Sequence, residues 1–269
     1  MAEGGIKRVY GVLVALVLLS QFLSVDGGAG NPPCNFPAVY SFGDGNSDTG
    51  ASSAAVASPS QLPDGKNTSR LPIPEDFSKA LYCLDIGQAD MYKEAMLDAS
   101  PSVITELINK FTVAIQTLYD QGGRAFWIHN VGPNGCFPAA QKNINRTLET
   151  FDKNGCINSW NKKVMQYNRQ LKKRVIKLRA ELSEAAITYV DVYTAMYELT
   201  NNAKKLGFTE PLKQCKNGTT CENPSSYIRW DGIHCTEAAN LFVAKKILNG
   251  SLSDPPVSIA HACHKTVSA

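Results

Sequence analysis

The strongest constraint on the fold of this chain is an alternation of short apolar runs with longer segments of helical periodicity. The runs are short enough to be buried strands, and they cover residues 38–42, 80–86, 124–128 and 186–190. Apolar side chains recur at helical spacing over 103–119 and 161–182, and a last helix is expected over 236–248. Strands that alternate with helices favour an α/β domain with a parallel sheet.

Composition supports a globular domain and argues against a nucleic-acid-binding protein. Of the 269 residues, 43% are hydrophobic and 19% are charged, which excludes disordered, collagenous and coiled-coil chains. The net charge is only +3, whereas binding to a phosphate backbone requires a dense basic surface. No nucleic-acid partner is therefore expected.

The amino terminus has the three-part pattern of a secretory signal peptide. Lys7 and Arg8 precede an apolar run over 9–25, and small residues follow over 27–30. A membrane anchor is the alternative, but the apolar run is short for a full span. We expect residues 1–28 to be removed, residues 29–269 to form a single domain, and the protein to be secreted to the extracellular space or cell wall without a membrane span.

Cysteines and glycosylation sequons agree with secretion. In an oxidising compartment most of the eight cysteines are expected to form disulfides, although 105 pairings are open. A zinc site is disfavoured because there is no C-x-x-C and because adjacent residues, such as His234 and Cys235, rarely ligate one metal; no metal is expected. Four N-x-S/T sequons are candidate glycosylation sites: Asn67, Asn145, Asn217 and Asn249.

The helix expected over 161–182 is unusually basic. Its basic residues are Lys162, Lys163, Arg169, Lys172, Lys173, Arg174, Lys177 and Arg179. We interpret them as a solvated outer face because the whole chain is nearly neutral. A polyanion-binding face is the alternative.

Residues 51–76 break the alternation of strands and helices. The segment is rich in Ser, Pro and Ala and has no sustained period. A crossover helix is expected after the first strand of a doubly wound sheet, but this stretch is typical of a loop or linker. A lid and a remnant of lost structure are both open.

Two short segments carry the chemistry. One is residues 42–50, directly after the first expected strand, and the other is residues 230–236, before the last helix. In the second, Asp231-x-x-His234 allows the carboxylate to accept the imidazole N–H and set its tautomer. Such a pair is half of a hydrolytic triad and still needs a nucleophile. His129 and Asn130 follow the third strand and either line a pocket or structure a loop.

With these segments the chain resembles the plant secreted GDSL esterase/lipase family, members of the SGNH hydrolases, and in particular its early-nodulin-like branch. The matching segments are residues 42–50, 77–82, 85–88, 123–138, 187–193 and 231–234. The resemblance implies a flavodoxin-like three-layer α/β/α fold, hydrolysis of carboxylic esters by Ser, His and Asp, and no cofactor. Asp231 and His234 fall on the catalytic Asp and His of the family.

Departures from the family pattern fall on the reacting groups. The nucleophile position is Gly45 instead of serine, and the position of the oxyanion-binding asparagine is Ala89, after Gly87 and Gln88. Gly45 and Gly87 still offer backbone N–H groups. The family's second block has no counterpart in 51–76, so we expect the second strand to be missing and a sheet edge to be exposed.

Loss of the nucleophile predicts little or no ester hydrolysis by the family mechanism. Two alternatives stay open: an active hydrolase that uses Ser47, and a non-catalytic carbohydrate- or protein-binding module. Ser47 is more typical of a loop-stabilising turn.

A thiolate role for Cys235 is an alternative, but a disulfide is expected. An acylated sugar, a lipid ester or a cell-wall component is the expected ligand class, and the oligomeric state is open.

Overall fold

The computed structural model describes residues 31–43, 74–97, 102–142, 144–216, 219 and 221–265. The predicted signal peptide, Gly45, Ser47, Asn67 and Asn217 lie outside these residues. The predictions about them, including the domain boundary after residue 28, stay predictions.

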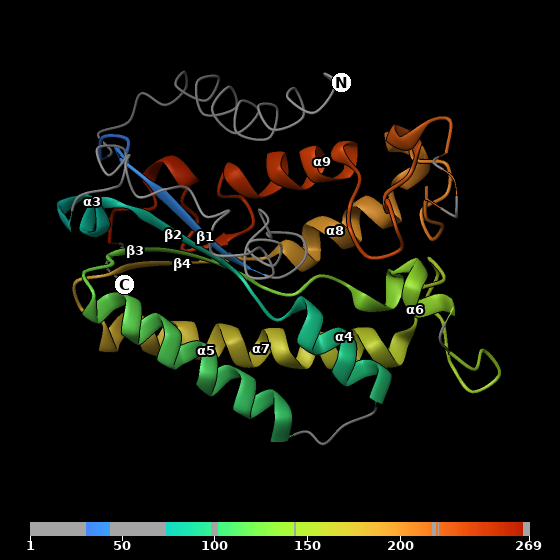
Figure 1. Ribbon diagram of the computed structural model, residues 1–269, viewed down its shortest axis with the longest axis horizontal. Helices are drawn as coiled ribbons and strands as arrows, with labels where there is room; N and C mark the ends of the chain where they lie inside the picture. Colours follow the sequence, from blue (N-terminus) through green and yellow to red (C-terminus); the bar gives the residue numbers. More distant parts are fainter. Residues whose placement is uncertain are drawn as a thin grey trace, which may run out of the picture. The chain divides into compact units, whose positions relative to one another are not determined.

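A five-stranded sheet forms the middle layer (Figure 1). Its strands are β1 (Val39–Gly43), β2 (Leu81–Asp85), β3 (Ala125–His129), β4 (Ala186–Val190) and β5 (Ser253–Asp254). The spatial order is β1-β2-β3-β4-β5; the first four strands are parallel, and β5 pairs antiparallel with β4. The four parallel strands confirm the predicted apolar runs, whereas the two-residue β5 was not predicted.

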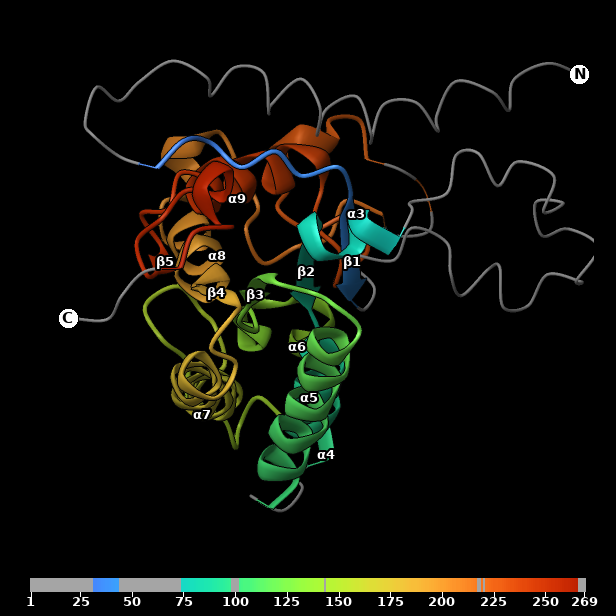
Figure 2. The same ribbon diagram turned by 90° about the vertical axis from the view of Figure 1, so that its left-hand side faces the viewer.

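Helices cover both faces of the sheet, so that the fold is the expected three-layer α/β/α arrangement. The α-helices are α3 (Pro74–Lys79), α4 (Gln88–Leu97), α5 (Ser102–Asp120), α6 (Pro138–Lys142), α7 (Asn158–Glu181), α8 (Val192–Asn201) and α9 (Glu237–Leu248). The 3₁₀ turns are η3 (Asn134–Cys136), η4 (Ala203–Leu206), η5 (Pro224–Ser226) and η6 (Ile259–His261). Helices α4, α5 and α7 lie on one side and α8 and α9 on the other (Figures 1 and 2).

Each face of the sheet has its own apolar core because successive strand residues point to opposite sides. Tyr82 and Leu84 of β2 pack with α5 and α7, whereas Leu81 packs with α8 and α9. The apolar face predicted for α7 is confirmed, since Val164 and Leu171 are fully buried.

The two sides of the parallel sheet differ in exposure. All five residues of β4 are buried, whereas Val39 and Phe42 of β1 are 56% and 38% exposed. Among the described residues β1 pairs only with β2. The predicted loss of a flanking strand concerns residues between 51 and 76, most of which lie outside the described part, and it stays a prediction.

The end of that segment corrects one expectation. Residues 51–76 were expected to be irregular, but helix α3 begins at Pro74. Proline suits the first helical position, and Glu75 and Asp76 in the first turn favour the positive end of the helix dipole.

Six of the eight cysteines form disulfides, in line with the expectation for most of them. The pairs are Cys34–Cys263, Cys136–Cys156 and Cys215–Cys221. The expectation of a disulfide at Cys235 was wrong. Cys235 is a buried free thiol in the α8–α9 core, where it accepts a hydrogen bond from Arg229.

Within the described part of the chain, no helix combines the length and the apolar character that a membrane crossing requires.

Candidate active site

The Asp231–His234 pair predicted from the sequence is formed. Asp231 Oδ2 lies 2.7 Å from His234 Nδ1, so that the ring N–H donates to the carboxylate and Nε2 is left as the basic nitrogen. The two side chains are 39% and 41% exposed, which leaves the imidazole open to solvent. The geometry matches the role of an orienting carboxylate and a general base.

The same carboxylate also holds the turn together. Asp231 Oδ1 accepts the backbone N–H groups of Ile233 at 3.1 Å and His234 at 2.9 Å. Burial alone would raise the pKa of Asp231, but the hydrogen bonds from the His234 ring and from these two N–H groups outweigh burial and lower it. Asp231 is therefore a structural residue of the turn as well as the partner of His234.

A left-handed glycine allows the chain to turn between the two residues. Gly232 has φ +96°, and a Cβ there would lie 2.8 Å from Gln214 Oε1. The Gly232 carbonyl accepts a hydrogen bond of 3.2 Å from the N–H of Ala139 in α6. Since α6 follows β3, this contact places the turn on the side of the sheet where the strands end, the usual location of ligand sites in such folds (Figure 1).

The buried Arg229 stabilises the turn through contacts with its backbone. Arg229 is only 3% exposed, and its Nη1 donates to the Ile233 carbonyl at 2.7 Å and to Cys235 Sγ at 3.2 Å. Its guanidinium lies 3.9 Å from the centre of the Phe137 ring. Burial lowers the pKa of Arg229. Sequence analysis missed this residue, because nothing in the local pattern distinguishes it from a surface arginine.

At the predicted oxyanion position the backbone conformation is constrained and the side chain is that of alanine. Gly87 lies between β2 and α4 with φ +113°, and a Cβ there would lie 2.8 Å from Tyr167 Oη. Gln88 is buried, accepts the N–H of Gly132 at 3.0 Å and donates to Asn134. Ala89 is exposed in the first turn of α4 and contributes only a methyl group.

Residues 132–139 connect the two sides. Gln88 contacts Gly132 and Asn134 at one end of this segment. At the other end Ala139 donates to Gly232 of the turn, and the Phe137 ring contacts Arg229. The disulfide between Cys136 and Cys156 closes a loop over the middle of it. The Asp231–His234 pair and the predicted oxyanion position are therefore connected through residues 132–139.

The residues at the end of β3, His129 and Asn130, make contacts that structure the site. Asn130 is 3% exposed, donates to Tyr189 Oη at 2.8 Å and to Asp191 Oδ1 at 2.9 Å, and accepts the N–H of Tyr193. His129 Nδ1 lies 3.6 Å from Asp85 Oδ1. Of the two predicted roles for Asn130, loop structuring fits its contacts.

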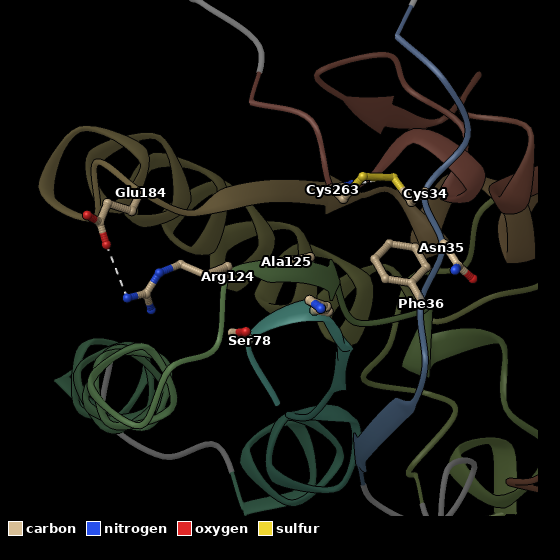
Figure 3. Close-up of a pocket in the computed structure, with 9 residues that line it drawn as sticks. Cys34, Asn35, Phe36, Ser78, Arg124, Ala125, Glu184 and Cys263 are labelled. Carbon is tan, nitrogen blue, oxygen red and sulfur yellow. Dashed lines mark hydrogen bonds and ion pairs between the residues drawn. A yellow bond between two sulfur atoms is a disulfide. The ribbon is translucent and has the colours of Figure 1, made fainter. Parts of the chain in front are cut away.

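A pocket of about 260 Å³ lies at the opposite end of the strands (Figure 3). Its lining includes Ala125, the first residue of β3, the Cys34–Cys263 disulfide, and Arg124, which pairs with Glu184 at 3.1 Å. Because ligands of parallel α/β sheets bind at the carboxyl ends of the strands, this pocket is separate from the candidate active site. His264 lies near the same two cysteine sulfurs, but the disulfide leaves no thiolate there for a metal.

Two of the predicted glycosylation sites can be placed. Asn145 is exposed in the loop after α6, and its Oδ1 accepts from the N–H and the hydroxyl of Thr147. Asn249 is exposed at the end of α9. Both amides are accessible, and their modification stays a prediction.

A parallel α/β sheet with an Asp–His pair on the side where its strands end is typical of hydrolases that use a serine nucleophile. The sequence model of the GDSL-like lipase/acylhydrolase family matches residues 15–247. The chain therefore belongs to this family, which confirms the resemblance seen in its sequence.

Curated relatives agree with this family. The chain is 42% identical to GDSL esterase/lipase At5g14450 of Arabidopsis thaliana, over 76% of this chain and 59% of the relative. It is 42% identical to GDSL esterase/lipase ACHE of Zea mays, over 72% and 57%, and 37% identical to GDSL esterase/lipase ENOD8 of Medicago truncatula, over 72% and 57%. The chain thus spans somewhat more than half the length of the relatives it matches.

Proposed function

We propose that this protein is a secreted GDSL esterase/lipase homologue in which ester hydrolysis by the family mechanism is impaired. The observation that carries the proposal is the contrast between a formed Asp231–His234 pair and a glycine, Gly45, at the nucleophile position. Ala89 at the oxyanion position supports it. The family suggests a ligand class that the protein would bind without turnover: an acylated sugar, a lipid ester or a cell-wall component.

The chemistry explains the impairment. In the serine mechanism the hydroxyl oxygen attacks the ester carbonyl carbon while its proton passes to the histidine Nε2, which then protonates the leaving alcohol. Gly45 has no oxygen to form the acyl intermediate. Loss of a nucleophile costs on the order of 10⁶ in kcat, and loss of one oxyanion donor from an intact enzyme about 10²–10³. These effects leave His234 with no hydroxyl to activate at that position.

Secretion is part of the proposal for separate reasons. The amino-terminal pattern of Lys7, Arg8 and the apolar run over 9–25 is that of a signal peptide. Three disulfides are formed, which is usual for proteins exposed to an oxidising compartment. Exposed sequon asparagines at 145 and 249 are compatible with glycosylation.

The test is hydrolysis of a short-chain nitrophenyl ester by the purified mature protein. We expect the wild-type rate to equal that of His234→Ala, because no nucleophile couples the imidazole to the ester. His264→Ala in the carboxyl-terminal tail is the matched control for the reactivity of surface histidines. We expect the double variant Gly45→Ser with Ala89→Asn to show an increase in rate that His234→Ala removes.

Opposite outcomes have distinct meanings. Wild-type turnover that is abolished by both His234→Ala and Ser47→Ala would overturn the proposal in favour of a substitute nucleophile. If the double variant folds but stays inactive, a further defect lies outside these two positions.

A further inference from the structure

Among the described helices and strands, α7 is the most basic. Over its 24 residues it has no acidic side chain before Glu181, its last residue. It lies beside α5 in the layer below the sheet, with one long side turned away from the strands (Figures 1 and 2). The structure shows which of its cations form ion pairs within the protein.

Three of the cations are neutralised at the two flanks of the helix. On one flank Lys172 and Arg179 each lie 2.8 Å from a carboxylate oxygen of Asp254 in β5. On the other, Arg174 binds both oxygens of Glu181 at 2.8 Å and donates to Thr112 of α5. These contacts hold the helix in place and are not available to a ligand.

Four other cations form a line along the outer side of the helix. Lys162, Arg169, Lys173 and Lys177 are all exposed. Their spacing places them within an arc of about 80° over a length of about 22 Å. Lys162, Arg169 and Lys173 have no ion-pair partner among the described residues, and Lys177 lies close enough to Glu181 to help lower the pKa of that carboxyl. We call these four residues the basic ridge.

We propose that the basic ridge binds a linear acidic polysaccharide lying along α7. The ridge is a single row of cations that repeat along the helix. Such a row suits one polysaccharide chain with a carboxylate or sulfate on successive sugars. Exposed Met165 and Ile176, 37% and 50% exposed, lie along the same side and offer apolar contact to sugar rings. This site is independent of the Asp231–His234 pair and does not rest on its activity.

The flanks of the ridge disfavour a flat anionic membrane. The carboxylates of Glu181 and Asp254 are 48% and 35% exposed, so a planar surface would press its phosphates against them. A single chain along the ridge avoids both. Nucleic acid is disfavoured because the aromatic residues of α7, Trp160 and Tyr167, are buried and cannot stack on bases.

The test is binding of fluorescently labelled polygalacturonate to the purified protein, measured by anisotropy at increasing salt. We expect binding that weakens as salt rises, because each contact releases counterions. The variant Arg169→Gln/Lys173→Gln/Lys177→Gln should bind on the order of 100-fold more weakly, given the contribution of each cation near an anionic surface.

A matched control separates the ridge from net charge. The variant Lys204→Gln/Lys205→Gln/Lys245→Gln removes three exposed cations elsewhere and should bind like the wild type. Equal losses in both variants, or no salt-sensitive binding by the wild type, would overturn the proposal. So would tighter binding to phosphatidylserine vesicles or to an oligonucleotide than to polygalacturonate.

Discussion

The two sides of the candidate active site differ in the side chains at their predicted catalytic positions. On the histidine side the turn is braced by Asp231, Gly232 and the buried Arg229, and its pair is formed. On the oxyanion side the backbone is equally constrained at Gly87, but the exposed side chain at 89 is only a methyl group.

The two sides differ in what the fold requires of the side chain at each predicted catalytic position. Asp231 accepts two backbone N–H groups, so the fold needs it whether or not a reaction occurs. An asparagine at position 89 would be exposed at a helix start and is not needed for packing. The presence of Asp231 is therefore weak support for catalysis.

The largest expected effect concerns the support of the histidine side. Arg229→Ala should lower the free energy of unfolding by about 3–5 kcal/mol, because it leaves a cavity beside Phe137 and removes the donor to the Ile233 carbonyl. Urea denaturation measures this. Arg169→Ala, an exposed arginine, should change stability by less than about 0.5 kcal/mol. A cost below about 1 kcal/mol at Arg229 would show that the turn does not depend on it.

A smaller effect is expected on the oxyanion side. Gly87→Ala should destabilise the protein by about 1–3 kcal/mol, because the residue has φ +113° and its Cβ would lie 2.8 Å from Tyr167 Oη. Combining it with Tyr167→Phe removes that oxygen and should recover part of the loss. Ala89→Asn should be nearly neutral, and a large cost there would contradict a purely chemical role for the position.

The stability costs of removing Asp231 and of removing His234 should differ. Asp231→Ala should cost about 1–2 kcal/mol, since two backbone N–H groups lose their acceptor. His234→Ala should cost less than about 0.5 kcal/mol, since the ring is exposed. Thermal unfolding of both variants measures the difference, and equal costs would remove the distinction between the two roles.

Acidification should reduce the contribution of Asp231. Its pKa is lowered in the folded state, so the stabilisation is present above the unfolded value of about 3.9 and is lost as pH falls through the lower folded value. The stability difference between wild type and Asp231→Asn should therefore shrink below about pH 4. A difference that is constant down to pH 2 would contradict this.

Periodicity in the sequence predicted most of the central architecture, because buried strands and long amphipathic helices leave strong local patterns. The strands β1 to β4 and the helices α5, α7 and α9 were found this way. Helices α4 and α8 were missed, since ten residues carry few periods.

Within the site, the limits have another cause. Motif spacing predicted the contact between Asp231 and His234, because a turn brings together two side chains that are three positions apart. The role of Arg229 depends on Phe137, more than 90 residues away, and cannot be read locally. Cys235 was expected in a disulfide, but its thiol packs beside that guanidinium instead.

The most direct test of the account is labelling of the purified protein with a fluorophosphonate, which reacts covalently with activated serine hydroxyls. Intact mass measures the outcome. We expect no adduct on the wild type, because position 45 is glycine, and one adduct per chain on Gly45→Ser with Ala89→Asn. A wild-type adduct that peptide mapping assigns to Ser47, and that His234→Ala removes, would contradict the account.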